Sequence, residues 1–322
     1  MASVITEKDI KHKYYVSTRN ACKLCAPLGA CLVFKGIEGC VPMVHGSQGC
    51  ATYIRRYTIS HFREPMDIAS SNFSEKTTVY GGSHNFITGI NNVIAQYRPK
   101  VMGIASTCLA ETIGEDVPAL IRDYQDANTG NKDLPLFVFA STPSYCGSHI
   151  DGFHHAVLAT LSSMADNGKQ QTHINLLPGM VSPADMRYLH EIMQEFEIDA
   201  VLFPDYSKSL DNVFTHEYQL IPSGGTKIKD IRRTGTAKAT IEFGIVFAKA
   251  STRVRATKNT PTAGEWLQEN RYIRNFQMPL PIGIKACDHF YNTLCKVGNK
   301  KMPEKFVEER GRLVDSYVDG HK

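Results

Sequence analysis

The sequence predicts an α/β fold in which doubly wound parallel sheets are flanked by helices. The first observation is a set of short apolar runs that alternate with longer amphipathic segments, at residues 41–44, 101–106 and 136–140. The second is that the same alternation resumes at residues 174–177 and 200–203. The third is a length of 322 residues with 42% hydrophobic residues, which is enough for a large core. Alternating strands and helices are typical of parallel sheets.

The first half of the chain predicts one α/β domain, residues 1–166. It begins with a polar arm at residues 1–20 and ends at a polar turn, Asp166-Asn-Gly-Lys169. Apolar runs and helical periodicity define the elements between them. In order, these are a helix at 25–34, a strand at 41–44, a helix at 51–62, a short strand and turn at 67–74, a helix at 85–97, a strand at 101–106, a helix at 110–124, a strand at 136–140 and a helix at 152–165.

The second half predicts another Rossmann-like domain, residues 167–283, followed by a helical segment, residues 284–322. Its pattern repeats the alternation of the first half but shows no internal sequence repeat. In order, the predicted elements are a strand at 174–177, a helix at 183–196, a strand at 200–203, a short helix at 227–234, a strand at 240–247, an extended run at 277–282, and helices at 284–295 and 303–319.

Composition excludes several classes of protein. The formal net charge is only +4 and the basic residues are scattered, so no nucleic-acid-binding stripe is indicated. No apolar run approaches the roughly 18 residues that a membrane helix needs. The polar N-terminus is not a secretory signal, and nine cysteines without one indicate reduced thiols or metal ligands in a cytoplasmic protein. Neither a G-x-G-x-x-G nor a Walker A motif is present.

The chemistry of the chain is expected around one motif, His45-Gly-Ser-Gln-Gly-Cys50. The motif lies between a predicted strand and a predicted helix, with Ser47 as a candidate N-cap, so Cys50 falls in the first helical turn. Free amide groups and the positive end of the helix favour a thiolate there. Gly46 and Gly49 let the backbone approach a bulky group closely. A thiolate in this setting suits a metal–sulfur cluster, and the alternative is an ordinary buried cysteine.

Three further residues are expected at the same place. Cys108 follows the strand at 101–106 and Ser144 follows the strand at 136–140. The carboxyl ends of parallel strands meet at one edge of a sheet, where open α/β sheets bind ligands. Cys25 opens an earlier helix and can join them. Zinc has weak support, because Cys22 and Cys25 form the only C-x-x-C pair.

These residues resemble the motifs of the nitrogenase component 1 family, in its β-type branch. The resemblance covers the whole chain, and the motifs occur in the family's order. They are Cys25-Ala-Pro-Leu-Gly-Ala30, His45-Gly-Ser-Gln-Gly-Cys50, His61-Phe-Arg-Glu-Pro65, Ser106-Thr-Cys-Leu-Ala-Glu-Thr-Ile-Gly114, Thr142-Pro-Ser144 and Gly147-Ser-His149. The family has three α/β domains, so residues 284–322 resemble the helical start of a third domain in a C-terminally truncated member.

The resemblance implies a set of cluster ligands. Cys25, Cys50 and Cys108 match the three cysteines that hold half of a P-cluster, and Ser144 matches a serine that can add a ligand. His45, Gly46 and Gly49 would lie in the cluster environment. The implied cofactor is a 4Fe–4S or P-cluster-like iron–sulfur cluster shared with a partner subunit. Two alternatives stay open, since His45 suits a structural role and Ser144 suits an N-cap of the helix that follows it.

Two functions fit the branch, and the first is a non-catalytic scaffold subunit for iron–molybdenum cofactor biosynthesis, of the NifN type. Stretches such as Asp67-Ile-Ala-Ser-Ser-Asn72 and Ala239-Thr-Ile-Glu-Phe-Gly244 resemble scaffold sequences. Its implied partners are a NifE-like α-type subunit in an α2β2 heterotetramer and, transiently, the nitrogenase iron protein. The alternative is the β subunit of molybdenum–iron nitrogenase, which the full set of Cys25, Cys50, Cys108 and Ser144 favours.

Overall fold

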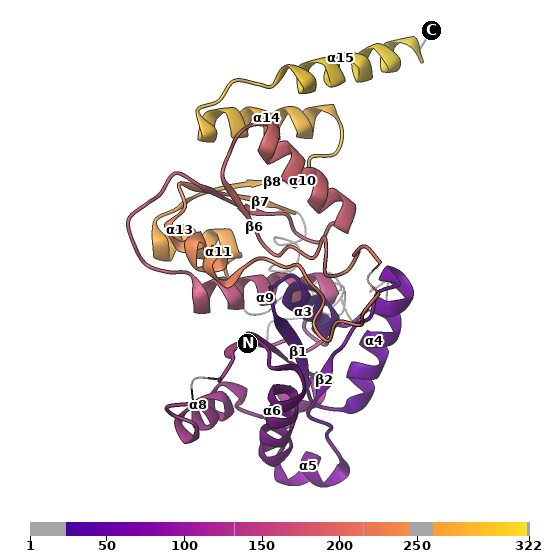
Figure 1. The fold of residues 1–322 in the computed structure, drawn as a ribbon, viewed down its shortest axis with the longest axis vertical. Helices are drawn as coiled ribbons and strands as arrows, with labels where there is room; N and C mark the ends of the chain where they lie inside the picture. Colours follow the sequence, from indigo (N-terminus) through magenta and orange to yellow (C-terminus); the bar gives the residue numbers. More distant parts are fainter. Residues whose placement is uncertain (1–23, 132, 215, 245–259, 321–322) are drawn as a thin grey trace, which may run out of the picture.

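Two parallel sheets form the framework of the protein. The computed structural model describes residues 24–131, 133–214, 216–244 and 260–320. Within these residues one four-stranded sheet has the order β2-β1-β3-β4 and the other has the order β6-β5-β7-β8. Every strand pair in both sheets is parallel. Helices flank both sheets, so the predicted α/β class is confirmed (Figure 1).

The strands of the first sheet end side by side. It consists of β1 (Cys40–His45), β2 (Ala69–Ser70), β3 (Val101–Ser106) and β4 (Leu136–Ala140). His45 pairs with Ser106 in register, and Ala105 pairs with Ala140. The loops that follow β1, β3 and β4 therefore leave the sheet next to one another, as expected at the carboxyl edge of a parallel sheet.

Alternate residues of these strands face different helices. Met43, Met102 and Ile104 pack with α6 (Ser83–Tyr97) and α8 (Val117–Ala127) on one face. Val44 and Ala105 belong to the core on the other face, which α3 (Ala26–Lys35) and α9 (His149–Met164) cover. The buried strands are almost wholly apolar because both faces are covered. The remaining helices of this part are α4 (Gln48–Phe62), α5 (Glu75–Tyr80) and α7 (Cys108–Thr112).

The second sheet repeats this arrangement. Its strands are β5 (Ile174–Leu177), β6 (Ala200–Leu202), β7 (Ala239–Phe243) and β8 (Arg274–Met278). The helices around it are α10 (Pro183–Glu195), α11 (Ile228–Arg233), α13 (Ala263–Arg271) and α14 (Ile284–Gly298), with a short 3-10 turn η1 (Thr234–Thr236). The last helix, α15 (Glu304–Asp319), lies at the far end of the molecule in Figure 1.

Helix α9 lies between the two sheets (Figure 1). It packs against α3 on one side and contacts α11 and α13 on the other. A Cβ added at Gly29 of α3 would stand 1.8 Å from the His149 carbonyl oxygen, and one added at Gly152 of α9 would stand 1.9 Å from the Ala26 oxygen. The two helices can cross this closely only because both positions are glycine.

Several predicted elements are corrected by the structure. The single helix expected at 110–124 is two helices, because Gly114 adopts φ +80° and Asp116 caps α8 with its carboxylate. The short strand expected within 67–74 is β2 at Ala69–Ser70, as predicted, whereas the extended run expected at 277–282 is β8 at Arg274–Met278. The helix expected at 152–165 begins at His149. The sequence analysis did not anticipate α5 or α13.

Some predictions stay untested. The arm at residues 1–20, and residues 245–247 of the strand expected at 240–247, lie outside the described residues. The domain boundaries proposed at residues 166 and 283 also stay predictions. One hydrophobic core cluster includes residues from both sheets.

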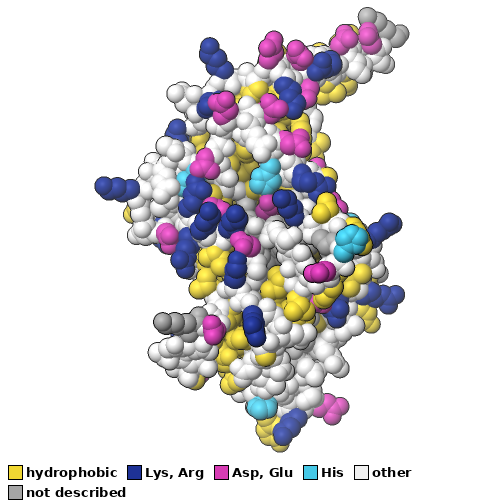
Figure 2. Space-filling view, in the orientation of Figure 1, with side chains coloured by type: hydrophobic (Ala, Val, Ile, Leu, Met, Phe, Trp, Pro, Cys, Tyr) yellow, Lys and Arg dark blue, Asp and Glu magenta, His cyan; other side chains and the backbone are white. Residues whose placement is uncertain are grey.

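The surface shows no simple division by charge. On the face drawn in Figure 2, Lys and Arg side chains lie among Asp and Glu side chains and form no continuous stripe. No helix within the described residues is both long enough and apolar enough to cross a membrane.

Candidate metal centre

The carboxyl edge of the first sheet brings the predicted site residues together. Cys50 follows β1, Cys108 follows β3 and Ser144 follows β4. Cys25 joins them from the start of α3, where it forms an isolated antiparallel bridge with Ser148. Four candidate ligands separated widely in sequence therefore lie at one edge of the sheet.

Cys50 occupies the helical position that the sequence predicts. Ser47 is the N-cap of α4, and its hydroxyl oxygen accepts a hydrogen bond from the Gly49 amide. Cys50 is the third residue of the helix and is half-buried. Gly46 has φ +148°, and a Cβ there would stand 1.9 Å from the Thr107 hydroxyl oxygen. Gly46 is thus required for the close contact between the Cys50 and Cys108 loops.

Ser144 connects the other two cysteine loops. Its backbone amide donates to the Cys108 sulfur at 3.2 Å, and its hydroxyl oxygen accepts from the Ala26 amide at 3.0 Å. Ala26 is the first residue of α3, directly after Cys25, so Ser144 satisfies a free amide at that helix start. The alternative in which Ser144 caps the following helix is wrong, because Ser148 is the N-cap of α9.

The three thiols influence one another electrostatically. Burial raises the pKa of Cys50, and the neighbouring Cys25 and Cys108 thiols raise it further. Burial also raises the pKa of Cys25, with a smaller contribution of the same sign from Cys108. In the chain by itself, burial and the neighbouring thiols therefore oppose the Cys50 thiolate that a helix N-terminus is expected to favour. A cation between the thiols would reverse this balance.

His45 is held in a closed hydrogen-bonded setting. Its side chain is fully buried, with Nδ1 3.0 Å from the Ser71 hydroxyl and Nε2 3.4 Å from a Glu115 carboxylate oxygen. The rings of Phe73 and Phe86 meet it edge-on, with centroids 4.9 and 5.0 Å away. Burial lowers the pKa of His45. These contacts match the structural alternative for His45, and its predicted place in a cluster environment stays untested.

The contacts of Glu111 are not predicted by the sequence. Its carboxylate accepts hydrogen bonds from the hydroxyls of Ser106 and Ser141, the second at 2.7 Å. Ser106 is the last residue of β3 and precedes Cys108 by two positions. Ser141 directly follows β4 and precedes Ser144 by three positions. In the sequence Glu111 lies three residues after Cys108, a position that indicates only an acidic side chain near a helix N-terminus.

The donor set is made mainly of cysteine thiols, the ligand type of iron–sulfur clusters. Among the described residues, no group of three or more His, Cys, Asp or Glu side chains is arranged to hold one metal ion. The eight cysteines in that part of the chain are free thiols. Thiols that come from separate loops to one edge of a sheet, with an amide directed at one sulfur, match the way iron–sulfur clusters are ligated and tuned.

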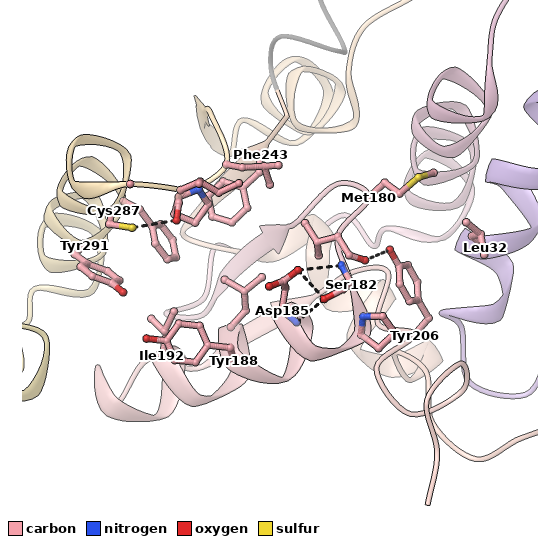
Figure 3. A pocket seen from close by; sticks show the side chains of 18 of the residues that line it. Leu32, Met180, Ser182, Asp185, Tyr188, Ile192, Tyr206, Phe243, Cys287 and Tyr291 are labelled. Carbon is pink, nitrogen blue, oxygen red and sulfur yellow. Dashed lines mark hydrogen bonds between the residues drawn. The ribbon is translucent and has the colours of Figure 1, made fainter. Parts of the chain in front are cut away.

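The other described cysteines are not among the predicted ligands. Cys31 and Cys40 are fully buried, and burial raises the pKa of Cys40 to about 12. Cys146 is exposed and Cys295 is half-buried. Cys287 lines a separate, largely apolar cavity of about 910 Å³ between α3, α10 and α14. Figure 3 shows Cys287 at one end of this cavity and Leu32 at the other, with the Cys287 thiol 3.0 Å from the Pro281 carbonyl oxygen.

Known proteins share both the sequence and the fold. The chain is 34% identical to the nitrogenase molybdenum–iron protein beta chain of Clostridium pasteurianum over 304 residues, which covers 94% of this chain and 64% of that protein. The corresponding beta chain of Methanothermobacter thermautotrophicus is 31% identical and is covered to 63%. A solved structure described as nitrogenase Cp1 at pH 6.5 superposes with a TM-score of 0.84 and 35% identity, over 92% of this chain and 62% of that one.

These relatives are longer than the present chain, which spans a little over three fifths of their length (64% and 63%). A family model described as nitrogenase component 1 type oxidoreductase matches residues 25–322. The match begins at the first candidate ligand and includes every other residue of the site. The chain therefore belongs to the nitrogenase component 1 type oxidoreductase family.

Proposed function

We propose that the chain is a β-type subunit that holds part of an iron–sulfur cluster at its interface with an α-type partner. The observation that carries the proposal is the convergence of Cys25, Cys50 and Cys108 at one edge of the first sheet. When bound, the cluster supplies one-electron transfer. The thiols of this chain bind and orient it, and the half-buried position of the site limits access of water.

Ser144 is proposed as a fourth, weaker ligand. Its hydroxyl oxygen lies in the same group of side chains, where the Ala26 amide now donates to it. Ligation by Ser144 would therefore compete with capping of α3. The proposed domain organisation, with boundaries at residues 166 and 283, gives the cluster to the first domain.

The proposed partner is an α-type subunit in an α2β2 heterotetramer. All of the thiols that meet at this edge are only half-buried, so the site lies near the surface. Helix α4, which carries Cys50, exposes Tyr53 and Tyr57, whose rings stack with centroids 6.5 Å apart. Exposed aromatic side chains beside an incomplete ligand set suit a surface that a second subunit covers.

Two members of the branch remain candidates. The first is the β subunit of a molybdenum–iron nitrogenase, with a P-cluster shared between subunits, and the names of the relatives favour it. The second is a NifN-type scaffold with a NifE-like partner, which receives electrons transiently from the iron protein. The stretches at residues 67–72 and 239–244, with their resemblance to scaffold sequences, favour this second candidate.

Co-expression with an α-type partner tests the proposal. We expect the chain purified alone without oxygen to lack a full complement of cluster iron, because its ligands form only part of a shell. The co-purified complex should contain iron and show the electron paramagnetic resonance of an iron–sulfur cluster. Acetylene reduction with the iron protein would identify a catalytic subunit, whereas cofactor maturation without reduction would identify a scaffold. A complex without iron would refute the cluster proposal.

A further inference from the structure

A network of hydrogen bonds joins the loop after β3 to the loop after β4. At its centre one carboxylate oxygen of Glu111 accepts from the Ser106 hydroxyl and, at 2.7 Å, from the Ser141 hydroxyl. Ser106 is the last residue of β3, and Ser141 directly follows β4. Glu111 lies in the short helix α7 that begins with Cys108. One side chain thus bonds to both loops that carry candidate cluster residues.

The same network extends along the β4 loop toward Ser144. The Thr142 amide donates to the Ser106 hydroxyl oxygen at 2.9 Å, and the Thr142 hydroxyl donates to the Ser106 carbonyl at 2.7 Å. Because the Ser106 hydroxyl donates its only hydrogen to Glu111, its oxygen is oriented to accept from Thr142. The Glu111 carboxylate therefore orients the Ser106 hydroxyl, which in turn accepts a hydrogen bond from the backbone of the β4 loop at Thr142.

The end of the network is the Cys108 sulfur. Two residues beyond Thr142, the Ser144 amide donates to that sulfur at 3.2 Å. An amide directed at a ligand sulfur stabilises negative charge on it and so shifts the reduction potential of an iron–sulfur cluster. The placement of this amide depends on how closely the β4 loop is held to the β3 loop.

We propose that Glu111 is a positioning residue that holds the Ser144 amide on the Cys108 sulfur. It does so by holding Ser106 and Ser141 together like a clamp, because one of its side-chain oxygens accepts a hydrogen bond from both hydroxyls. Glu111 makes no contact with the Cys108 sulfur among the described interactions and is not assigned as a ligand. The effect on a bound cluster rests on the proposed function, but the clamp itself does not.

Amide hydrogen exchange in the cluster-free chain tests the clamp directly. In Glu111→Ala we expect exchange at Thr142 and Ser144 to accelerate about threefold to tenfold, the effect of one net hydrogen bond. The Cys50 amide, which donates to the Ser47 carbonyl at 3.2 Å in another loop, should exchange as before. Glu111→Gln should keep near-normal rates, because its carbonyl oxygen can still accept both serine hydroxyls.

Two more variants complete the design. Glu75→Ala removes an exposed glutamate from the first turn of α5 and should leave Thr142 and Ser144 unaffected. Ser141→Ala removes one half of the clamp at an exposed position, and should accelerate exchange at Ser144 if Glu111→Ala fails to fold. In the iron-loaded complex, Glu111→Ala should lower the reduction potential of the cluster while the iron content stays unchanged.

Each outcome decides the inference. Unchanged exchange at Ser144 in both Glu111→Ala and Ser141→Ala would overturn it. So would equal acceleration at Cys50, which would indicate general loosening, or a Glu111→Gln variant as fast as Glu111→Ala. If the wild-type complex binds no iron, the proposed function fails and the exchange results still decide the clamp.

Discussion

At the scale of single residues, burial and the nearness of other thiols both favour the protonated form of Cys25 and Cys50. Cys25 and Cys50 are buried enough, and close enough to Cys108, that their protons are held more tightly than in water. Thiols in this state are weak nucleophiles and become good ligands only when a metal takes the place of the protons. The arrangement is therefore suited to a resident cluster and poorly suited to cysteine-based catalysis.

The prediction at this scale compares two cysteines in different places. We expect Cys50→Ala to lower the iron bound by the co-expressed complex, because it removes one of three converging thiols. Cys287→Ala should leave the iron content unchanged, since that thiol lines the separate apolar cavity. Colorimetric iron analysis of the two anaerobically purified complexes makes the comparison. Equal iron in both variants would remove Cys50 from the ligand set.

The sequence was informative for some site residues and silent on others. Cys50 and Cys108 could be placed because each follows a buried strand and opens a helix, a pattern read locally. The bond from the Ala26 amide to Ser144 spans 118 positions, and the contacts of Glu111 with Ser141 span 30. Such partners depend on how loops meet in space, and a single sequence contains no local signal for them.

At the scale of secondary-structure elements, the crossing of α3 and α9 decides where Cys25 lies. Cys25 immediately precedes α3, and its bridge partner Ser148 immediately precedes α9. The backbones touch at Gly29 and Gly152, with no room for a Cβ atom at either position. The first turn of each helix is thereby fixed relative to the other.

We therefore expect Gly29→Ala and Gly152→Ala each to lower the free energy of unfolding by about 1–3 kcal/mol, the usual effect of overpacking a core. Gly311→Ala is the matched control, because a Cβ there meets nothing within 4 Å on helix α15. That variant should be as stable as the original or more stable by up to about 1 kcal/mol, through better helix propensity. Urea unfolding curves of the three variants measure the difference. Equal stability of Gly29→Ala and Gly311→Ala would contradict the close crossing.

Elements themselves were predictable where the pattern was strong. The strands β3 and β5 occupy the predicted residues, since uninterrupted apolar runs bounded by polar turns allow few alternatives. The break at Gly114 was missed because Val117 and Ile121 continue the apolar spacing of a helix across it. Helix α13 was missed because it is short and mostly polar, with Leu267 as its largest fully buried side chain.

At the scale of the whole molecule, buried and half-buried histidines make stability depend on pH. Burial lowers the pKa values of His45, His149, His154 and His173 below the ordinary value of 6.5. Between these lowered values and 6.5 the unfolded chain binds more protons than the folded chain, so acid favours unfolding. Stability should thus be full above about pH 7 and should decline as the pH falls through 6.5 and below.

The prediction can be checked with one variant. We expect the melting temperature of the chain to be a few degrees lower at about pH 5.5 than at about pH 7.5, and this difference to shrink in His173→Gln. His173 is buried, and its Nε2 lies 3.0 Å from the Arg233 carbonyl oxygen. Glutamine can place an amide donor near that position but cannot be protonated. The same pH difference in the variant would show that His173 does not contribute.

Helix α9 also has a mechanical consequence for the molecule. Its 16 residues form a rod about 24 Å long, with one end beside the thiol group and the other near the second sheet. Beyond that end, the Ala165 carbonyl accepts from Arg271 at 2.9 Å, and the Asp166 amide donates to the Arg232 carbonyl at 2.9 Å. The helix is thus attached to both halves of the molecule. Moving the two sheets apart would require breaking the contacts at one of its ends, so α9 couples the position of the thiols to that of the second sheet.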